Sequence, residues 1–155
     1  MNRRIYIGTT RFNNSTFKEN EAWRIKNNWK GCIYGLNKKI PPHIPKNAIV
    51  YVIEMNNDTN RVEGIGLIRN FINYAYNIRI YKHNTEYNRY VYNSDYRLSN
   101  DNIKYKKSLL LLEKILFYGS RHYKRGHGIS FINTSTINPK INKLLKRFLR
   151  KLFVY

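Results

Sequence analysis

AIVYVIEM (48–55) decides the fold, together with the two stretches that follow it, NNDTN (56–60) and RVEGIGLIR (61–69). The first stretch is apolar and rich in β-branched residues, and the second is a dense turn signal. The three therefore predict a long antiparallel hairpin. Gly64 and Gly66 share one face of its second strand, so we expect a bend there or another element close to the backbone.

Working outward from the hairpin, we expect regular structure on both sides of it. Before it, the sequence predicts a strand at 3–7 closed by Gly8, a helix capped by Ser15 or Thr16, and a strand or tight turn at 31–35. The proline-rich stretch 41–45 is a rigid connector. After it, we expect strands at 76–82 and 87–92, a helix at 102–118, a short strand at 129–132 and a final helix opened by Asn138-Pro139.

This order indicates an α+β fold with a mainly antiparallel sheet and flanking helices. The 155 residues fit one domain, 1–155, and 42% of them are hydrophobic, which is enough for a core. Cys32 is the single cysteine, so neither an internal disulfide nor a cysteine zinc site can form, and a reducing intracellular compartment is expected. No stretch approaches the length of a membrane span.

Net charge is the strongest functional signal. Lys and Arg number 29 against 9 acidic residues, which leaves a formal charge of +20. A field of this strength attracts polyanions and repels other copies of the chain. The expected partner is therefore a nucleic acid, DNA or RNA, whose phosphates supply most of the non-specific affinity.

The segment 119–128, GSRHYKRGHG, is called the basic loop here. Glycines let backbone amides approach a phosphate, cations neutralise it, and histidine can stack or donate a hydrogen bond. We expect it to bind phosphate, with a simple solvated loop as the alternative. The residues concerned are Arg121, His122, Lys124, Arg125 and His127.

Catalytic patterns are weak. His122 and His127 lack the helical i, i+4 spacing of a zinc pair, and no phosphate loop of the nucleotide-hydrolase type is present. The nearest carboxylate trio, Glu54, Asp58 and Glu63, straddles a turn. We therefore expect a non-enzymatic protein without metal or cofactor. A nuclease that uses the two histidines remains the alternative.

The C-terminal helix is basic and amphipathic, with apolar residues at i, i+3, i+4 spacing. Its cations are expected to contact phosphates; a membrane surface, a partner groove and a core-packed helix with a solvated basic face are the alternatives. These cations are Lys140, Lys143, Lys146, Arg147, Arg150 and Lys151.

Aromatic residues beside cations are candidates for stacking on bases. Trp29, next to Lys30, is the better candidate for exposure, whereas Trp23 is expected in the core, with base stacking as the alternative. Strand alternation would place Tyr90 and Tyr92 together on one face as a further stacking surface.

The run from Trp29 through the hairpin, within 29–97, resembles the PUA-like superfamily, which includes EVE and YTH domains. The resemblance implies a small β-barrel with flanking helices that binds RNA or a modified base in an aromatic pocket, with Trp23 or Trp29 as the nearest counterpart of the pocket wall. The Asn-, Ile-, Lys- and Tyr-rich composition is also similar to that of large DNA virus proteins, which implies a cytoplasmic or virion location. A virion protein that packages nucleic acid by charge is then the alternative function.

Overall fold

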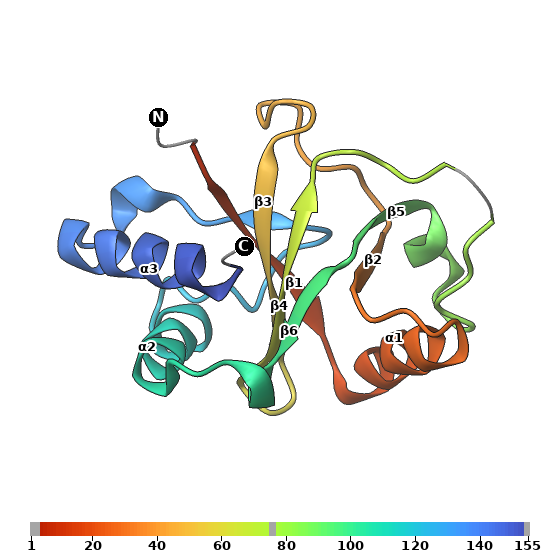
Figure 1. The fold of residues 1–155 in the computed structure, drawn as a ribbon, viewed down its shortest axis with the longest axis horizontal. Helices are drawn as coiled ribbons and strands as arrows, with labels where there is room; N and C mark the ends of the chain where they lie inside the picture. The colour runs from red at the N-terminus through yellow and green to blue at the C-terminus, as the bar shows by residue number, and fades with distance from the viewer. Residues whose placement is uncertain (1–3, 75–76, 154–155) are drawn as a thin grey trace.

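A computed structural model describes residues 4–74 and 77–153 (Figure 1). Within them lie seven strands, three α-helices and three short 3₁₀ turns. The strands are β1 (Tyr6–Phe12), β2 (Cys32–Leu36), β3 (Ile49–Asn56), β4 (Arg61–Arg69), β5 (Tyr90–Ser94), β6 (Tyr96–Ser99) and β7 (Ser130–Phe131). The helices are α1 (Asn14–Lys26), α2 (Lys106–Phe117) and α3 (Pro139–Leu152), and the turns are η1 (Thr85–Asn88), η2 (Asn100–Asn102) and η3 (Thr134–Thr136).

The predicted hairpin is confirmed as β3 and β4, which pair antiparallel at the centre of a five-stranded sheet ordered β6-β4-β3-β1-β7. A register shift beside Glu54 inserts one extra residue, Glu63, into β4. β1 pairs with β3 in parallel, whereas the other strand pairs are antiparallel. The α+β prediction is therefore confirmed, with a mixed five-stranded sheet and a separate pair, β2-β5.

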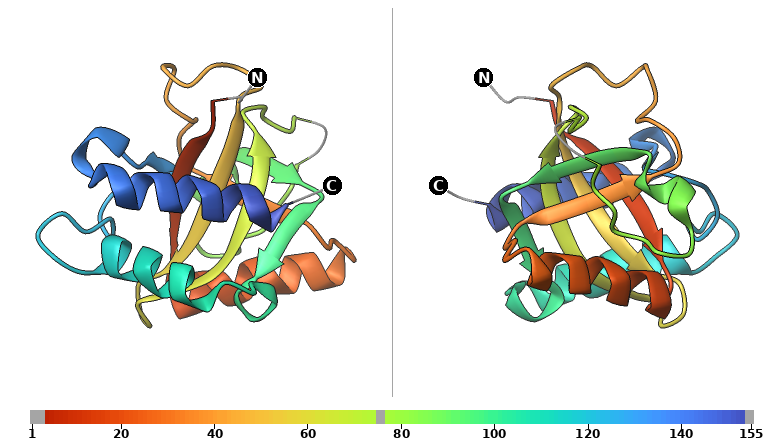
Figure 2. Two further views of the ribbon diagram at one scale, coloured as in Figure 1. Left: turned by 60° about the vertical axis from the view of Figure 1, so that its left-hand side comes forward. Right: turned by 90° about the vertical axis from the view of Figure 1, so that its right-hand side faces the viewer.

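Each face of the large sheet carries its own apolar core, and the two views of Figure 2 show the elements that cover each face. On one face α2 and α3 lie side by side and bury a helix-side core that includes Ile53, Ile65, Leu112, Phe148 and Leu149. On the other face β2 and β5, with α1 beside them, bury an inter-sheet core that includes Phe12, Ile33, Leu36, Val52, Ile68 and Tyr81. Alternate residues of β3 enter opposite cores, as expected for a strand buried on both faces.

β1 corrects the predicted strand that ended at Gly8. Arg3 lies outside the described residues, and the strand runs through Gly8 to Phe12. Gly8 lies inside the sheet, where it pairs with Val52 and Phe131, and a Cβ there would lie 2.5 Å from Ile129 Cγ2. This glycine therefore allows close packing and does not end the strand.

The predicted helix cap was wrong by a few residues. Asn13 caps α1: its Oδ1 accepts from the Thr16 amide at 2.8 Å, and Thr16 Oγ1 accepts from the Asn13 amide at 3.0 Å. This is a capping box in which Asn13 is the N-cap and Thr16, one of the predicted caps, is the N3 residue. The apolar side chain of Ile25 is exposed on α1.

The predicted strand at 76–82 does not form at the described positions 77–82, and Tyr76 lies outside the described residues. The side chain of Asn88 takes the place of a strand partner, since its Oδ1 accepts from the Ile80 and Tyr81 amides and its Nδ2 donates to the Tyr81 carbonyl. Residues 85–88 form η1 instead, and the strand predicted at 87–92 begins only at Tyr90.

The C-terminal half follows the prediction more closely. α2 begins four residues later than expected because Asn100 starts the turn η2, where its Nδ2 donates to the Val62 carbonyl. The predicted short strand and final helix are confirmed as β7 and α3, with Asn138 as the N-cap of α3. None of the helices described is both long and apolar enough to span a membrane.

Candidate nucleic-acid interface

A cavity of about 420 Å³ opens where the end of β1 meets the basic loop. Its walls come from the end of β1, the first turn of α1, the end of β2, the turn after β3, the segment 81–87 and residues 124–128 of the basic loop. The volume falls within the range of small-ligand sites, roughly 300–1,000 Å³. Phe12, Leu36 and Tyr81 belong both to this wall and to the inter-sheet core.

Arg11 holds the basic loop in place. Its guanidinium donates five hydrogen bonds: to the carbonyls of Gly126 (3.1 Å), Tyr123 (3.3 Å) and Gly128 (2.6 Å), and to Thr9 Oγ1 and Ser130 Oγ (both 3.1 Å). Gly126 and Gly128 have φ values of 118° and 68°, a conformation that side-chain-bearing residues rarely adopt. The two glycines therefore let the loop present its carbonyls to a single fork of donors.

The positive charge of Arg11 has no carboxylate partner. The ion pairs within residues 4–74 and 77–153 are Arg61–Glu113 and Arg97–Glu54. Burial lowers the pKa of Arg11, and none of the residues lining the described cavity is acidic. With Lys124 and His127 also in the wall, the cavity is suited to an anionic or electron-rich ligand.

Two tyrosines contribute aromatic rings to the cavity wall. The rings of Tyr81 and Tyr87 meet edge to face, with centroids 6.2 Å apart. Tyr81 is buried, which raises its pKa, so its hydroxyl stays protonated, whereas Tyr87 is only half-buried. Gly35 permits this arrangement because a Cβ at that position would collide with the Tyr87 carbonyl. Tyr87 is thus the ring that a ligand in the cavity can reach.

Asn57 joins the turn after β3 to the basic loop. Its Nδ2 donates to the Lys124 carbonyl at 2.9 Å, and its backbone amide donates to the Phe12 carbonyl. Its Oδ1 is buried and has no hydrogen-bond partner among the described residues. A buried acceptor without a partner costs free energy, so this contact between the turn and the basic loop is made at some cost in stability.

The predicted phosphate-binding residues divide into two groups. Lys124 and His127 line the cavity, while Arg121 and Arg125 are exposed on the same loop. His122 is half-buried, and its Nδ1 accepts from the Lys124 amide at 3.2 Å. The cations of α3 do not line this cavity: Lys140, Lys143, Arg147, Arg150 and Lys151 are exposed on the helix, and Lys146 is half-buried.

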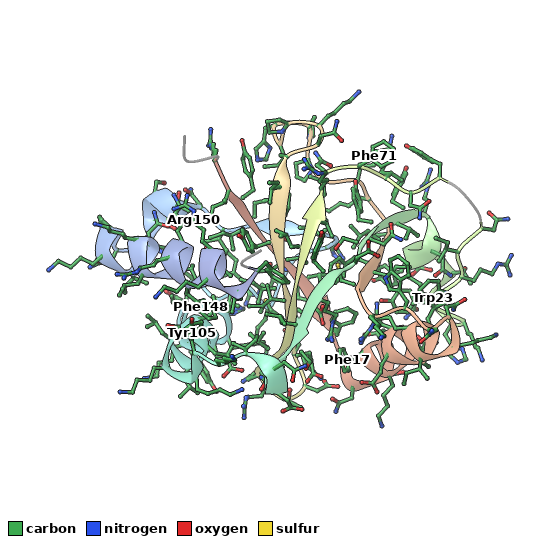
Figure 3. The ribbon with its side chains drawn as sticks, viewed as in Figure 1. Phe17, Trp23, Phe71, Tyr105, Phe148 and Arg150 are labelled. Atoms are coloured by element: carbon green, nitrogen blue, oxygen red, sulfur yellow. The ribbon has the colours of Figure 1, made fainter. Side chains whose placement is uncertain are left out.

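The predicted stacking residues lie away from the cavity. Trp29 is half-buried, and its Nε1 donates to the Cys32 carbonyl at 3.0 Å, beside exposed Lys30. Trp23 packs from α1 against the inter-sheet core (Figure 3). These two tryptophans, the basic loop and α3 therefore do not surround a common groove.

Tyr90 and Tyr92 correct the prediction of a shared stacking face. Tyr92 is only 1% exposed, and its hydroxyl accepts from the Ile40 amide at 3.0 Å, so its ring cannot reach a base. Tyr90 is half-buried, with the cations of Lys39 and Arg89 5.6 and 5.3 Å from its ring centroid. Of the pair, only Tyr90 retains an accessible edge.

Two of the three candidate metal carboxylates are already engaged. Glu54 accepts from Tyr34 Oη at 2.7 Å and from Arg97 Nη2 at 2.7 Å, while Asp58 Oδ2 accepts from the Asn14 amide. Burial raises the pKa of Glu63. Over the described ranges, no three His, Cys, Asp or Glu side chains gather as a metal site would require.

Arg11, Asn57, Tyr81 and Tyr87 were not predicted as site residues. Ending the first strand at Gly8 removed Arg11 from consideration. The signal available for it was a lone cation between Thr10 and Phe12 in an otherwise uncharged segment. Tyr81 carried no signal, and Tyr87 was expected only as part of a basic aromatic face with Tyr90 and Tyr92, because the meeting of Tyr81 and Tyr87 depends on a segment that is not a strand.

Comparison with known proteins gave no match to a family model, to a curated protein or to a solved structure.

Proposed function

We propose that the protein binds single-stranded nucleic acid, with one base in the cavity beside Tyr87 and the flanking phosphates on the basic loop. The observation that carries this proposal is the composition of the cavity wall: Arg11, Lys124 and His127 line it together with the half-buried ring of Tyr87, and the described lining contains no acid. Aromatic stacking and phosphate neutralisation are the two sources of affinity in single-strand binding.

The polar groups of the cavity suit base recognition. Lys124, which lines the cavity, can meet a phosphate, and the half-buried ring of Tyr87 can stack on a base. A modified base is a candidate ligand, since a cavity of about 420 Å³ has more room than contact with one edge of a base requires. The Glu54–Arg97 pair lies outside this wall, so binding involves no buried carboxylate.

We also propose that the two sheets correspond to a small PUA-like barrel. β2 and β5 lie across one face of the hairpin, as the resemblance of residues 29–97 to that superfamily implies. In those proteins RNA or a modified base lies in an aromatic pocket. Here Tyr87, and not Trp29, would supply the aromatic wall.

The test is fluorescence anisotropy with labelled single-stranded RNA and DNA oligonucleotides. If about six phosphates are neutralised, affinity falls by roughly 10³ between 50 and 200 mM salt. Tyr87→Ala should weaken binding by roughly 1–3 kcal/mol if a base stacks there. The matched control is Tyr74→Ala, which removes a 75% exposed tyrosine from outside the cavity wall.

Absence of binding at physiological salt would refute the proposal. Equal losses for Tyr87→Ala and Tyr74→Ala would refute the base pocket but leave phosphate binding in place. Repeating the series with oligonucleotides that carry modified bases then identifies the preferred base.

Packaging of nucleic acid by charge alone is the second candidate function. It is favoured by one observation: cations occupy two faces of the molecule, with the α3 set on the face opposite β2 and β5. Packaging predicts the same affinity for single and double strands and no effect of Tyr87→Ala. Charge reversal on α3 would then weaken binding as much as charge reversal in the basic loop.

A further inference from the structure

A second concave surface lies between α2 and α3, remote from the nucleic-acid cavity. It is a groove of about 220 Å³ lined mainly by apolar side chains, among them Leu111 and Ile115 of α2 and Ile141 and Leu144 of α3. Leu144 is 55% exposed at its edge. A half-exposed leucine in the wall of an apolar groove indicates a surface that a partner can cover.

Cations flank the groove on both sides. Lys107 lines the groove on α2. Lys114 lies three positions after Leu111, so Lys114 and Leu111 are neighbours on the surface of the same helix. On α3, Lys140 and Arg147 lie four positions before and three after Leu144. Neither ion pair found in the described chain includes any of them.

The far end of the groove is closed by aromatic packing. Tyr105, just before α2, meets Phe148 of α3 edge to face at 6.2 Å, and Lys151 Nζ lies 5.6 Å from the Tyr105 ring centroid. Figure 3 shows Tyr105 and Phe148 together where α3 crosses above α2. The groove therefore has a fixed end, an apolar floor and basic sides.

We propose that this groove binds an acidic amphipathic segment of a partner protein, with apolar side chains on the floor and carboxylates against the flanking cations. Charge complementarity selects this occupant. A second copy of the chain is disfavoured, because each copy carries a net charge of +20.

Other occupants fit the groove less well. A membrane would need the apolar face of α3, but Leu145, Phe148 and Leu149 are buried in the helix-side core and cannot turn outward. A nucleic acid would contact the cations, but its phosphates would make no favourable contact with Leu111, Ile115 or Leu144. An acidic amphipathic peptide uses both kinds of surface.

The test uses a fluorescein-labelled synthetic peptide with leucines at i, i+3, i+4 and i+7 and glutamates elsewhere. A peptide of the same composition with the leucines scrambled off one face is the control. Anisotropy at roughly physiological ionic strength should show the amphipathic peptide binding about tenfold or more tighter than the scrambled one.

Leu144→Glu and Leu110→Glu form a matched pair of variants. Both leucines are 55% exposed and both changes add one negative charge, but only Leu144 lines the groove. Leu144→Glu should weaken peptide binding about tenfold, while Leu110→Glu should change it by less than about twofold. Far-UV circular dichroism checks that both variants remain folded, as their exposed positions predict.

Four results would overturn the proposal. Equal affinity for the two peptides, or equal losses in the two variants, would show that charge alone is responsible. Phosphatidylserine vesicles that bind the protein and lose affinity with Leu144→Glu, while the peptide does not bind, would assign the groove to a lipid surface. A single-stranded oligonucleotide that loses affinity with Leu144→Glu but not with Leu110→Glu would assign it to nucleic acid.

Discussion

Nη2 of Arg11 donates to the Gly128 carbonyl at 2.6 Å and so joins an interior strand to the basic loop across 117 positions of sequence. With its four other hydrogen bonds, the guanidinium sets the position of Gly126 and Gly128 and, through them, of the neighbouring His127. The basic loop therefore depends on β1 for its conformation, and nucleic-acid affinity should depend on a residue whose donors are all directed into the protein.

Arg11→Lys tests this dependence, because it keeps the charge but cannot span carbonyls on both sides of the loop. We expect nucleic-acid affinity to fall about tenfold and the free energy of unfolding to fall by roughly 1–3 kcal/mol as carbonyls lose their donors. Anisotropy and urea denaturation measure the two effects. Arg79→Lys, at an exposed position, should change neither; if both variants bind equally well, the loop does not depend on Arg11.

Arg97→Ala should destabilise the protein by about 3–5 kcal/mol, because it leaves Glu54 charged and unpaired inside the fold. Arg97 makes a two-pronged contact with Glu54, and both side chains are almost fully buried. Arg61→Ala is the control: it breaks the other ion pair, in which the arginine side chain is 59% exposed, and should cost about 1 kcal/mol or less. Similar midpoints of urea denaturation for the two variants would contradict this ranking.

Gly66→Ala should destabilise the protein by about 3 kcal/mol through overpacking. A Cβ there would collide with Tyr34 Oη and lie 2.8 Å from Cys32 Sγ. The comparison is Gly119→Ala, where nothing lies within 4 Å of the added carbon, so only its φ of 84° matters, at about 1–2 kcal/mol. Thermal denaturation of the two variants distinguishes a steric requirement from a conformational one. If Gly66→Ala is the more stable of the two, β2 does not pack against Gly66 as described.

The stability of the protein should fall between about pH 9 and pH 11 because of Cys32. Burial raises the pKa of its thiol to about 11, whereas an unfolded cysteine titrates near 8.5. In this window the unfolded chain releases the proton and the folded chain keeps it, so rising pH favours unfolding by about 2–4 kcal/mol. Below the window both states are protonated and the effect disappears.

Cys32→Ser isolates this contribution, because serine does not titrate there and can keep a hydrogen bond to Ser94, whose Oγ lies 3.3 Å from the Cys32 sulfur. Burial raises the pKa of Tyr81 in both proteins alike, so its effect cancels, whereas the pKa of Tyr34, raised by burial and by Cys32, contributes to the difference. Urea denaturation at several pH values measures the difference. Parallel stability curves for the wild type and Cys32→Ser would show that the thiol is not protected in the folded state.

Local sequence signals predicted the elements whose stabilising contacts are near in the chain. The β3–β4 hairpin follows from its turn, and α3 follows from its apolar spacing and the Asn138-Pro139 start. Gly64 and Gly66 were expected to lie where another element comes close, and Tyr34 and Arg97 pack there. In each case the signal is a periodic pattern or a glycine without a Cβ, and it lies within a few residues of the feature that it predicts.

The cavity could not be predicted in this way. Its walls come from residues 10–16, 35–36, 57, 81–87 and 124–128, and no local pattern relates these segments. The same holds for Asn88, whose side chain replaces a strand partner for Ile80 and Tyr81. The buried positions of Tyr92 and Arg11 likewise depend on contacts distant in sequence.

Composition and periodicity by themselves determined the basic character of this protein, its α+β class, the central hairpin and the amphipathic C-terminal helix. Only the tertiary structure decided which cations share a surface: the basic loop folds around Arg11 at the end of β1, and Lys124 and His127 line the cavity there. The physical reason is that charge and propensity act residue by residue, whereas a binding site requires chain segments far apart in sequence to meet. Their meeting is set by the packing of two cores on opposite faces of one sheet.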